Sequence, residues 1–279
     1  MPCGYGTELM DHERVLEQIV AWASADDNIR VVVLTGSAAL GPEHVHALSD
    51  LDVELYVAQP IVLLEDEAWY AQFGEVLVVE SLPNPGWYPT RLVCYIDGKI
   101  DFMVGPVDAL ATVRYVRPFR VLLDKDRAAD ALPPAELLVT DPPTAASFRE
   151  CIHWFYAAAL MCAKCVVRDE PWQAKFRDWD LKQQLLRMIE WDHKARYGWS
   201  YDTWSRGKRL KQWIDADLFE ALDACWAGFD GSDTARALLA SLELFERLST
   251  RTAHLLGMAA FDARRVQAEV RAVLEQAAG

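Results

Sequence analysis

The segment Val31-Val32-Val33-Leu34-Thr35-Gly36-Ser37, followed after a twelve-residue loop by Asp50-Leu51-Asp52, indicates the fold of this chain. The β-branched run predicts a buried strand that ends at Gly36. A glycine and a small hydroxyl at the end of a strand allow the backbone to approach a phosphate group closely. We therefore expect Gly36 and Ser37 to form one half of a phosphate-binding site.

Three aspartates follow this segment, each on or beside a predicted strand. Asp50 and Asp52 lie two residues apart at the start of the alternating stretch 51–57, so their carboxylates share one face. Asp101 lies in the apolar stretch 99–104, where an ionised carboxylate is costly unless a metal ion or a donor compensates it. Carboxylate oxygens are ligands that Mg²⁺ prefers. The three acids together predict a magnesium site, although each alone also fits an ordinary surface or edge position.

The first half of the chain alternates helix and strand patterns. A helix is predicted over residues 9–24, and a loop over residues 36–49. Asp97-Gly98 separates two predicted strands and is typical of a two-residue hairpin turn with positive φ angles. Strands are predicted over residues 29–34, 51–57, 76–80, 91–96, 99–104 and 120–123. This order predicts a small domain built on a mixed sheet.

The pattern changes at the paired prolines Pro133-Pro134 and Pro142-Pro143, which mark a linker. Thr144 is placed to cap the helix that follows. Apolar residues then recur at helical spacing in the segments 148–167, 181–191, 218–226, 234–256 and 262–277. We expect an α+β fold, with a mixed-sheet domain over residues 1–140 and an α-helical bundle over residues 141–279.

Composition places the chain among globular proteins. Its 279 residues are 52% apolar and include 11 Trp, enough to form a sizeable core. No uninterrupted apolar run approaches the roughly 18 residues of a membrane helix. The N-terminus shows no basic segment followed by an apolar one, so we expect no secretory signal and a cytoplasmic location.

Acidic charge is concentrated in the first half. The whole chain carries 28 basic and 42 acidic residues, a net charge of −14, which argues against binding to nucleic-acid phosphates. Residues 1–140 hold 9 Lys and Arg against 22 Asp and Glu (−13), and residues 141–279 hold 19 against 20 (−1). An acidic half attracts metal ions or a cationic substrate, and it also fits a surface kept acidic for solubility.

The cysteines and paired histidines do not form a zinc-binding pattern. The closest cysteines among six, Cys162 and Cys165, lie in an Ala-rich helical stretch without a second close pair to complete four ligands. We expect packed thiols there. His44 and His46 are predicted to lie in a solvated loop.

The order of strand, Gly-Ser, loop, Asp-X-Asp and later strand Asp resembles the nucleotidyltransferase superfamily, which shares a DNA polymerase β-like catalytic core. In more detail the chain resembles the aminoglycoside 6-adenylyltransferase family, which modifies streptomycin. One departure is Ala38, because family members typically carry Arg there. The matching stretches are 35–37, 49–52, 97–101, 121–126, 163–164, 168–170, 174–176 and 185–191.

The resemblance implies an N-terminal polymerase β-like nucleotidyltransferase domain with ATP as co-substrate. The expected reaction transfers AMP to a hydroxyl of an aminoglycoside and thereby gives antibiotic resistance. Asp50, Asp52 and Asp101 would hold two Mg²⁺ ions that clamp the triphosphate. Asp101 is the first candidate for the general base that activates the acceptor hydroxyl, and Asp178 is the second.

Two other functions fit the same residues. One is a nucleotidyltransferase that acts on another small molecule or on a protein hydroxyl. The other is a non-catalytic nucleotide-binding module of the antitoxin-like kind, against which the retention of three acids argues, because their mutual repulsion is unfavourable without a ligand. The choice between ATP and GTP and the oligomeric state stay open.

Phosphate charge also requires fixed cations. Lys164 lies in the otherwise apolar segment 157–167, where a buried ammonium needs an anionic partner such as a nucleotide phosphate, although extension to solvent is the alternative. Lys175 is a second nucleotide-binding candidate. Lys208 belongs to a basic cluster, residues 206–211, that also fits a solvated face.

Substrate contacts are predicted at an acid and at an aromatic residue. Asp178 is a candidate substrate-binding residue, and the alternative is a solvated helix acid beside Lys175 and Lys182. Trp87 lies in a predicted loop together with Tyr88, and Trp69 lies in another loop of the same half. Each of these three rings either lines a substrate cleft or packs in the core.

Overall fold

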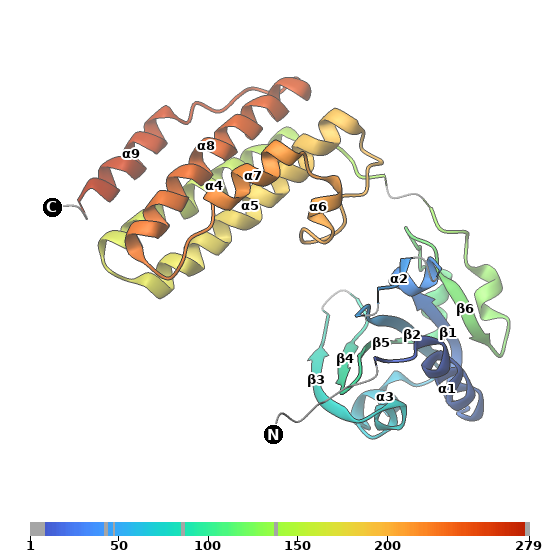
Figure 1. Ribbon diagram of the computed structural model, residues 1–279. Helices are drawn as coiled ribbons and strands as arrows, with labels where there is room; N and C mark the ends of the chain where they lie inside the picture. The colour runs from blue at the N-terminus through green and yellow to red at the C-terminus, as the bar shows by residue number, and fades with distance from the viewer. Residues whose placement is uncertain (1–8, 42–43, 47, 85–86, 137–138, 277–279) are drawn as a thin grey trace, which may run out of the picture. The chain divides into compact units, whose positions relative to one another are not determined.

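The computed structural model describes residues 9–41, 44–46, 48–84, 87–136 and 139–276 (Figure 1). The chain divides into two compact units, Met1–Leu137 and Leu138–Gly279. The division falls inside the proline-rich segment 133–143. Each unit has its own buried apolar core, so each is stabilised by its own packing.

The first unit is built on a mixed sheet of six strands in the order β3-β4-β5-β2-β1-β6 (Figure 1). The central strands β2 and β5 run parallel, and the other neighbouring pairs are antiparallel. The six predicted strands and the mixed sheet are thereby confirmed. The strands are β1 (Ile29–Thr35), β2 (Leu51–Val57), β3 (Val76–Leu82), β4 (Thr90–Tyr95), β5 (Lys99–Pro106) and β6 (Arg120–Asp124).

The two faces of this sheet are covered by different elements. Helix α1 (His12–Ala25), helix α3 (Pro60–Glu65) and the 3₁₀ turn η2 (Trp69–Phe73) share one apolar core with one face. The short turns η3 (Val107–Ala111) and η4 (Ala128–Ala131) pack on the other face, beside Val31, Val33, Tyr56 and Met103. Because side chains alternate along a strand, the residues two positions from these four, including Thr35, Glu54 and Asp101, belong to this second face.

The hairpin between β4 and β5 differs from the predicted turn. Its connection is three residues long, 96–98, and the Tyr95 N–H donates to the Gly98 carbonyl at 2.8 Å. Neither Asp97 nor Gly98 has a positive φ, so the prediction of a two-residue positive-φ turn is wrong. Glycine is required here for space, because a Cβ on Gly98 would lie 2.7 Å from the Met10 Cβ.

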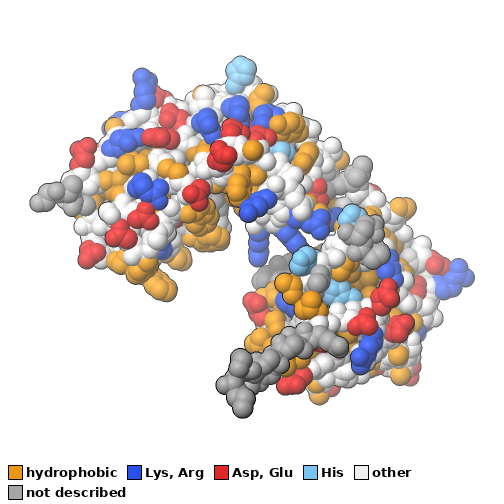
Figure 2. All heavy atoms as spheres, viewed as in Figure 1, with side chains coloured by type: hydrophobic (Ala, Val, Ile, Leu, Met, Phe, Trp, Pro, Cys, Tyr) orange, Lys and Arg blue, Asp and Glu red, His pale blue; other side chains and the backbone are white. Residues whose placement is uncertain are grey.

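The second unit is helical, as predicted. Its four long helices, α4 (Ala145–Val167), α5 (Pro171–Tyr197), α8 (Gly231–Leu255) and α9 (Arg264–Glu275), pack around one core (Figure 1). Two shorter helices, α6 (Leu210–Trp213) and α7 (Ala216–Ala224), lie between α5 and α8 in the sequence. Thr144 caps α4 as expected, since its Oγ1 accepts from the Ser147 N–H at 3.1 Å. Charged and apolar side chains are interspersed over the face of this unit that Figure 2 shows.

Helix α4 is the central apolar element of this bundle. Within the described ranges it is the one helix that is long and apolar enough to cross a membrane by length and composition, although no uninterrupted apolar run signals it. Half of its apolar window is buried inside the protein, as in the core helix of a globular fold. Cys162 and Cys165 on this helix are buried free thiols, which confirms that interpretation of the pair.

Candidate active site

A row of polar side chains crosses the second face of the sheet where β1, β2 and β5 lie side by side. Thr35 pairs with Asp52 across the antiparallel strands, and Asp52 pairs with Asp101 across the parallel strands. Asp50 directly precedes β2, two residues before Asp52. The predicted meeting of the three acids on neighbouring strands therefore follows from the register.

Lys99 connects two of the three acids. Its Nζ lies 3.0 Å from Asp50 Oδ2 and 2.7 Å from Asp101 Oδ1, and all three side chains are partly exposed. Burial lowers the pKa of Lys99, but hydrogen bonds to Asp101 and Asp50 outweigh it, so the pKa ends above its ordinary value. The ammonium is therefore a permanent positive charge among the carboxylates. The sequence prediction missed this role, although Lys99 stands two residues before Asp101 and so shares its face.

The backbone of Gly36 lies directly against the Asp52 carboxylate. Gly36 has a φ of +67°, and a Cβ at this position would lie 1.9 Å from Asp52 Oδ2. No residue with a side chain fits there. Gly36 also opens the short helix α2 (Gly36–Ala39), which contains Ser37 and lies in a segment predicted to be a loop, so that prediction was wrong for these four residues.

A fourth acid, Glu54, lies one pair further along the same face of β2. Its Oε2 accepts hydrogen bonds from the hydroxyls of Tyr115 at 2.6 Å and Tyr56 at 2.8 Å. Burial raises the pKa of Glu54, the two tyrosine hydrogen bonds oppose this, and the charge of Asp52 adds to it. The alternation of β2 indicates its position, but only the structure shows the two tyrosines that hold it.

The donor set of this face fits a hard divalent cation. Carboxylates of Asp50, Asp52 and Asp101 come from two adjacent strands, and the Lys99 ammonium already holds a positive charge between two of them. Among the described residues no group of three His, Cys, Asp or Glu side chains is arranged to hold a metal ion as it stands. The magnesium site therefore stays a prediction, supported by the chemistry of the donors.

Aromatic residues lie further along the same face. Tyr88 covers Gly105, where a Cβ would come within 3.0 Å of the Tyr88 ring, and Gly105 stands four residues after Asp101 on β5. The Trp87 ring lies 5.4 Å from that of Tyr88 and is 54% exposed, so it is available to a substrate. Trp69, by contrast, is buried and stacks on Trp22 in the opposite core, at a centroid distance of 5.1 Å.

The two predicted nucleotide-binding lysines belong to the helical unit. Lys164 is exposed on the outer side of α4, because the apolar stripe of α4 faces the core and Lys164 does not. Of the two alternatives for this lysine, extension to solvent is therefore confirmed, and a buried ammonium is wrong. Lys175 is partly buried and donates to the Ala227 carbonyl at 3.1 Å and to Thr234 Oγ1 at 3.0 Å. These contacts give Lys175 a structural role, and nucleotide binding by either lysine stays a prediction.

Asp178 is buried rather than solvated. It accepts a hydrogen bond of 2.6 Å from Lys182 Nζ, one helical turn later on α5, and the side chains are 8% and 4% exposed. The alternative of a solvated helix acid is therefore wrong, because Lys182 neutralises the carboxylate inside the bundle. Its role as base or substrate ligand stays a prediction.

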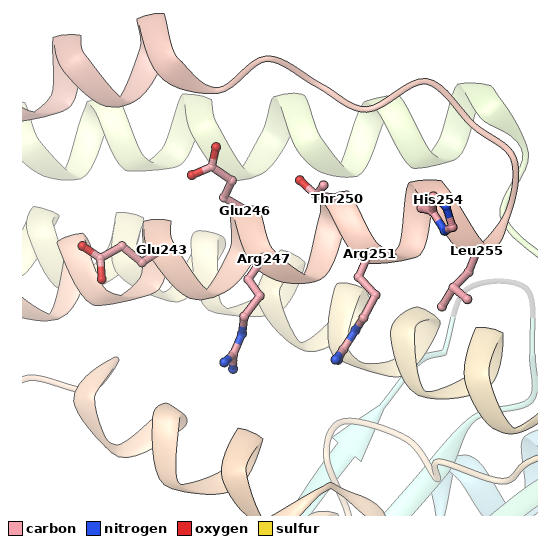
Figure 3. Close-up of a pocket in the computed structure, with 7 residues that line it drawn as sticks. All are labelled: Glu243, Glu246, Arg247, Thr250, Arg251, His254 and Leu255. Carbon is pink, nitrogen blue, oxygen red and sulfur yellow. The ribbon is translucent and has the colours of Figure 1, made fainter.

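A hollow on α8 does not gather groups that could act together (Figure 3). All of its lining residues come from this one helix. Arg247 and Arg251 extend in the same direction, whereas Glu246 points the other way (Figure 3). Arg251 is already committed to the buried Asp192, with both hydrogen bonds at 2.6 Å.

The sequence model of the streptomycin adenylyltransferase family matches residues 10–274. The chain belongs to this family. It is similar to aminoglycoside 6-adenylyltransferases of Campylobacter jejuni (24% identity, 77% of this chain and 78% of the relative) and Staphylococcus aureus (22%, 87% and 91%). A crystal structure of an aminoglycoside 6-adenyltransferase from Bacillus subtilis aligns over 97% of this chain and 99% of that one, with 19% identity and a TM-score of 0.47.

Membership of the family makes the chain an adenylyltransferase-family enzyme. The family implies the use of ATP, together with an aminoglycoside as the other substrate. The resemblance to the aminoglycoside 6-adenylyltransferase family is therefore confirmed.

Proposed function

We propose that this enzyme transfers AMP from ATP to a hydroxyl group of an aminoglycoside in a magnesium-dependent reaction, with streptomycin as the first acceptor to test. The observation that carries the proposal is the register of Asp52 and Asp101 on parallel strands, with the backbone of Gly36 against Asp52. We assign the transfer chemistry to residues 1–140 and substrate binding to the helical residues 141–279.

Asp50, Asp52 and Asp101 are the residues that would hold magnesium. A magnesium ion held by these carboxylates would supply positive charge that offsets the negative charge developing on the α-phosphate. Lys99 keeps Asp50 and Asp101 close together, because its ammonium offsets the repulsion between their like charges. The site is thus organised for a cation by the chain itself.

The transfer step uses groups on this face of the sheet. The acceptor oxygen attacks the α-phosphorus, a new P–O bond forms, the bond to the β-phosphate oxygen breaks, and pyrophosphate leaves. Asp101 accepts the proton of the acceptor hydroxyl, because a hydroxyl is a weak nucleophile until it is deprotonated. The Gly36 backbone and the Ser37 hydroxyl supply donors for phosphate oxygens.

The charge of the first unit suits a cationic acceptor. Residues 1–140 carry a net charge of −13, which raises the local concentration of polycationic molecules such as aminoglycosides. The exposed ring of Trp87, which lies 5.4 Å from the Tyr88 ring, offers an apolar surface. A sugar or cyclitol ring of the acceptor would pack on it.

The decisive experiment incubates the protein with Mg-ATP and streptomycin, and then with other aminoglycosides and lincosamides. The proposal requires pyrophosphate release and a product heavier than the acceptor by one adenylyl group in mass spectrometry. Asp52→Asn should lose both signals, whereas Asp108→Asn, an exposed acid on η3, should keep them. If no acceptor gives a product, the proposal of an aminoglycoside acceptor is rejected. Replacing ATP by GTP in the same assay tests which nucleobase the enzyme prefers.

A further inference from the structure

One side of α5 carries large aromatic side chains that are open to solvent. Trp172, Phe176 and Trp179 are 77%, 56% and 57% exposed, and they lie four and three residues apart, so they line one side of the helix. Trp226 (52% exposed) and Phe229 (64%) follow α7 and add two more open rings. Trp179 and Trp226 line the same hollow, and Trp172 and Phe229 lie edge to face with ring centroids 6.4 Å apart. These five side chains form one surface, the aromatic face.

The spacing along α5 is that of a helix that packs against another element. The residues of this side recur at intervals of four, three, four and three, which is the repeat of a seam between packed helices. They are Trp172, Phe176, Trp179, Gln183 and Leu186. The chain itself packs on the C-terminal end of the seam, where a Cβ on Gly207 would lie 3.7 Å from Leu186 Cδ2. The aromatic end of the same seam stays exposed.

The exposed aromatic surface is large for a protein that stays monomeric. An aromatic side chain offers about 150–250 Å², so five rings exposed by 52–77% leave about 600 Å² in water. The largest apolar patch of a typical monomer measures about 300–600 Å², and larger patches mark interaction sites. Two such faces in contact would bury about 1,200 Å² in total, the area at which stable protein interfaces begin.

The composition of the aromatic face is that of the centre of a protein interface. It consists of three Trp and two Phe, with no charged residue. Aromatic residues are enriched and charged residues depleted at interface centres, and Trp often dominates the binding energy there. The open side of α8 differs, because Glu243, Arg247 and Arg251 line its hollow. The aromatic face is therefore suited to an apolar partner surface.

Two cations lie against these rings, and the chain already neutralises both. Arg177 lies 5.8 Å from the Phe176 ring centroid and pairs with Asp180 at 3.2 Å. Lys182 lies 5.5 Å from the Trp226 ring centroid and pairs with Asp178 at 2.6 Å. Nucleic acids and anionic membranes are bound through clusters of unpaired basic groups. A protein surface is the better match.

We propose that the aromatic face is the contact surface of a homodimer, in which two copies of this chain meet α5 to α5 about a two-fold axis. A two-fold contact uses the same patch on both copies, so the patch must be complementary to itself. An uncharged aromatic surface meets this condition, because it brings no like charges together. The inference goes beyond the proposed function, since it requires neither a nucleotide nor an acceptor.

The test measures the mass of the full-length protein by sedimentation velocity, without nucleotide, at concentrations from about 1 to 100 µM. We expect the wild type to shift from a 31.5 kDa monomer to a dimer of twice that mass. Trp172→Glu and Phe176→Glu should each raise the dimer Kd about thirtyfold or more, because the two-fold axis places each new charge in the interface twice. Thermal melting shows that each variant is folded.

Trp154→Glu is the matched control. Trp154 is 57% exposed, like Trp179, but it lies on α4. This substitution should change the dimer Kd less than about twofold. Raising NaCl from about 50 to 500 mM should leave the wild-type Kd unchanged or lower it, because salt does not screen the association of apolar surfaces.

Three results would overturn the inference. The first is a wild type that stays monomeric up to about 100 µM, since the face then binds a partner of another kind. The second is a dimer that neither Trp172→Glu nor Phe176→Glu weakens, or whose Kd rises about tenfold with salt, because another and charged surface then makes the contact. The third is a loss of affinity in Trp154→Glu as large as that in Phe176→Glu.

Discussion

Two lysine–aspartate arrangements, one in each unit, differ in charge balance and in access to solvent. In the sheet unit, Lys99 serves both Asp50 and Asp101, and all three side chains are partly exposed. In the helical unit, Lys182 serves Asp178 alone, and both side chains are almost completely buried. On the sheet face one lysine serves two carboxylates, whereas the helical pair is one lysine with one carboxylate and is neutral.

This difference separates a binding site from a structural pair. A partly exposed group with excess negative charge can gain a cation from solution, because its carboxylates need little desolvation and their oxygens are ligands that Mg²⁺ prefers. A closed neutral pair has nothing to gain from a ligand and is costly to break. Substitutions on the sheet face should therefore change metal binding, nucleotide binding and turnover. Substitutions in the helical pair should change the free energy of unfolding.

The largest expected effect is on turnover at Asp52. Asp52→Asn removes a carboxylate that would hold magnesium and conserves its volume, so adenylyl transfer should fall by about 10³-fold or more. The apo protein should be at least as stable as wild type, because one of the repelling charges is gone. Single-turnover rates and thermal melting measure the two effects. Retention of a tenth of wild-type activity would show that Asp52 is not a metal ligand.

Breaking the buried pair should instead destabilise the fold. Lys182→Met leaves Asp178 unpaired inside the bundle and should lower the free energy of unfolding by about 3–5 kcal/mol. The double variant Lys182→Met/Asp178→Leu should recover most of this loss. Chemical denaturation of the three proteins measures it. An equal loss in the single and double variants would mean that packing, rather than the unpaired charge, is responsible.

Asp101→Asn distinguishes a general base from a metal ligand. If Asp101 is the general base, the substitution should lower the single-turnover rate by about 10²-fold and leave Mg-ATP affinity nearly unchanged. If Asp101 is only a metal ligand, the substitution should weaken Mg-ATP binding, and a higher magnesium concentration should partly restore it. We expect the first result, because Asp50 and Asp52 remain for the metal. A loss of affinity that magnesium restores would show that Asp101 is a metal ligand and not the general base, and would leave Asp178 as the candidate base.

Lys99→Met tests the comparison on the sheet face. Removing the ammonium takes away the charge that offsets the repulsion between Asp50 and Asp101, so the variant should lose about 1 kcal/mol of stability, a modest amount because the groups are partly exposed. Added Mg²⁺ should then raise its melting temperature more than that of wild type. An equal response to Mg²⁺ in both proteins would mean that Lys99 and the metal do not share these carboxylates.

The smallest expected effect is a pH dependence from the helical unit. His193 is buried beside the rings of Tyr197 and Tyr201, 4.5 Å away in each case. Burial and Arg196 lower its pKa, against Asp215 and Asp192. The unfolded chain therefore binds more protons between the folded and unfolded pKa values, so stability is full above about pH 6.5 and falls as the pH drops below it.

His193→Phe should flatten this dependence between about pH 5 and 7. Denaturation at several pH values in wild type and variant checks it. His254→Phe is the control, because His254 is exposed on α8. If His193→Phe leaves the slope unchanged, another group titrates in this range.

The periodicity of the sequence predicted which acids lie on the site. It did not predict the features that depend on strand pairing, such as the contacts of Lys99. The two-residue spacing of Asp50 and Asp52 was sufficient to place them on one face. Nothing local determines that β2 pairs with β5 in the register that sets Asp52 beside Asp101, and the function of Lys99 depends on that register. The family resemblance supplied the expected reaction and co-substrate, which residue spacing does not indicate.

The helical unit shows the opposite case. The i, i+4 spacing of Asp178 and Lys182 is a local signal that predicts an ion pair on a helix, and it could have been recognised. Whether that pair faces solvent or core depends on the packing of α5 against α4 and α8, which the sequence does not specify. The choice between burial and exposure of Lys164 stayed open at the level of sequence for the same reason.

The contact between Gly36 and Asp52 restricts how this protein can change over generations. Any residue other than glycine at position 36 would collide with the Asp52 carboxylate, and any residue that makes room at position 52 would remove the acid. Neither position can therefore vary first without loss of the site. A chain that lost one of the two residues while keeping the other would lose the site at that single step, so Gly36 and Asp52 should be retained together.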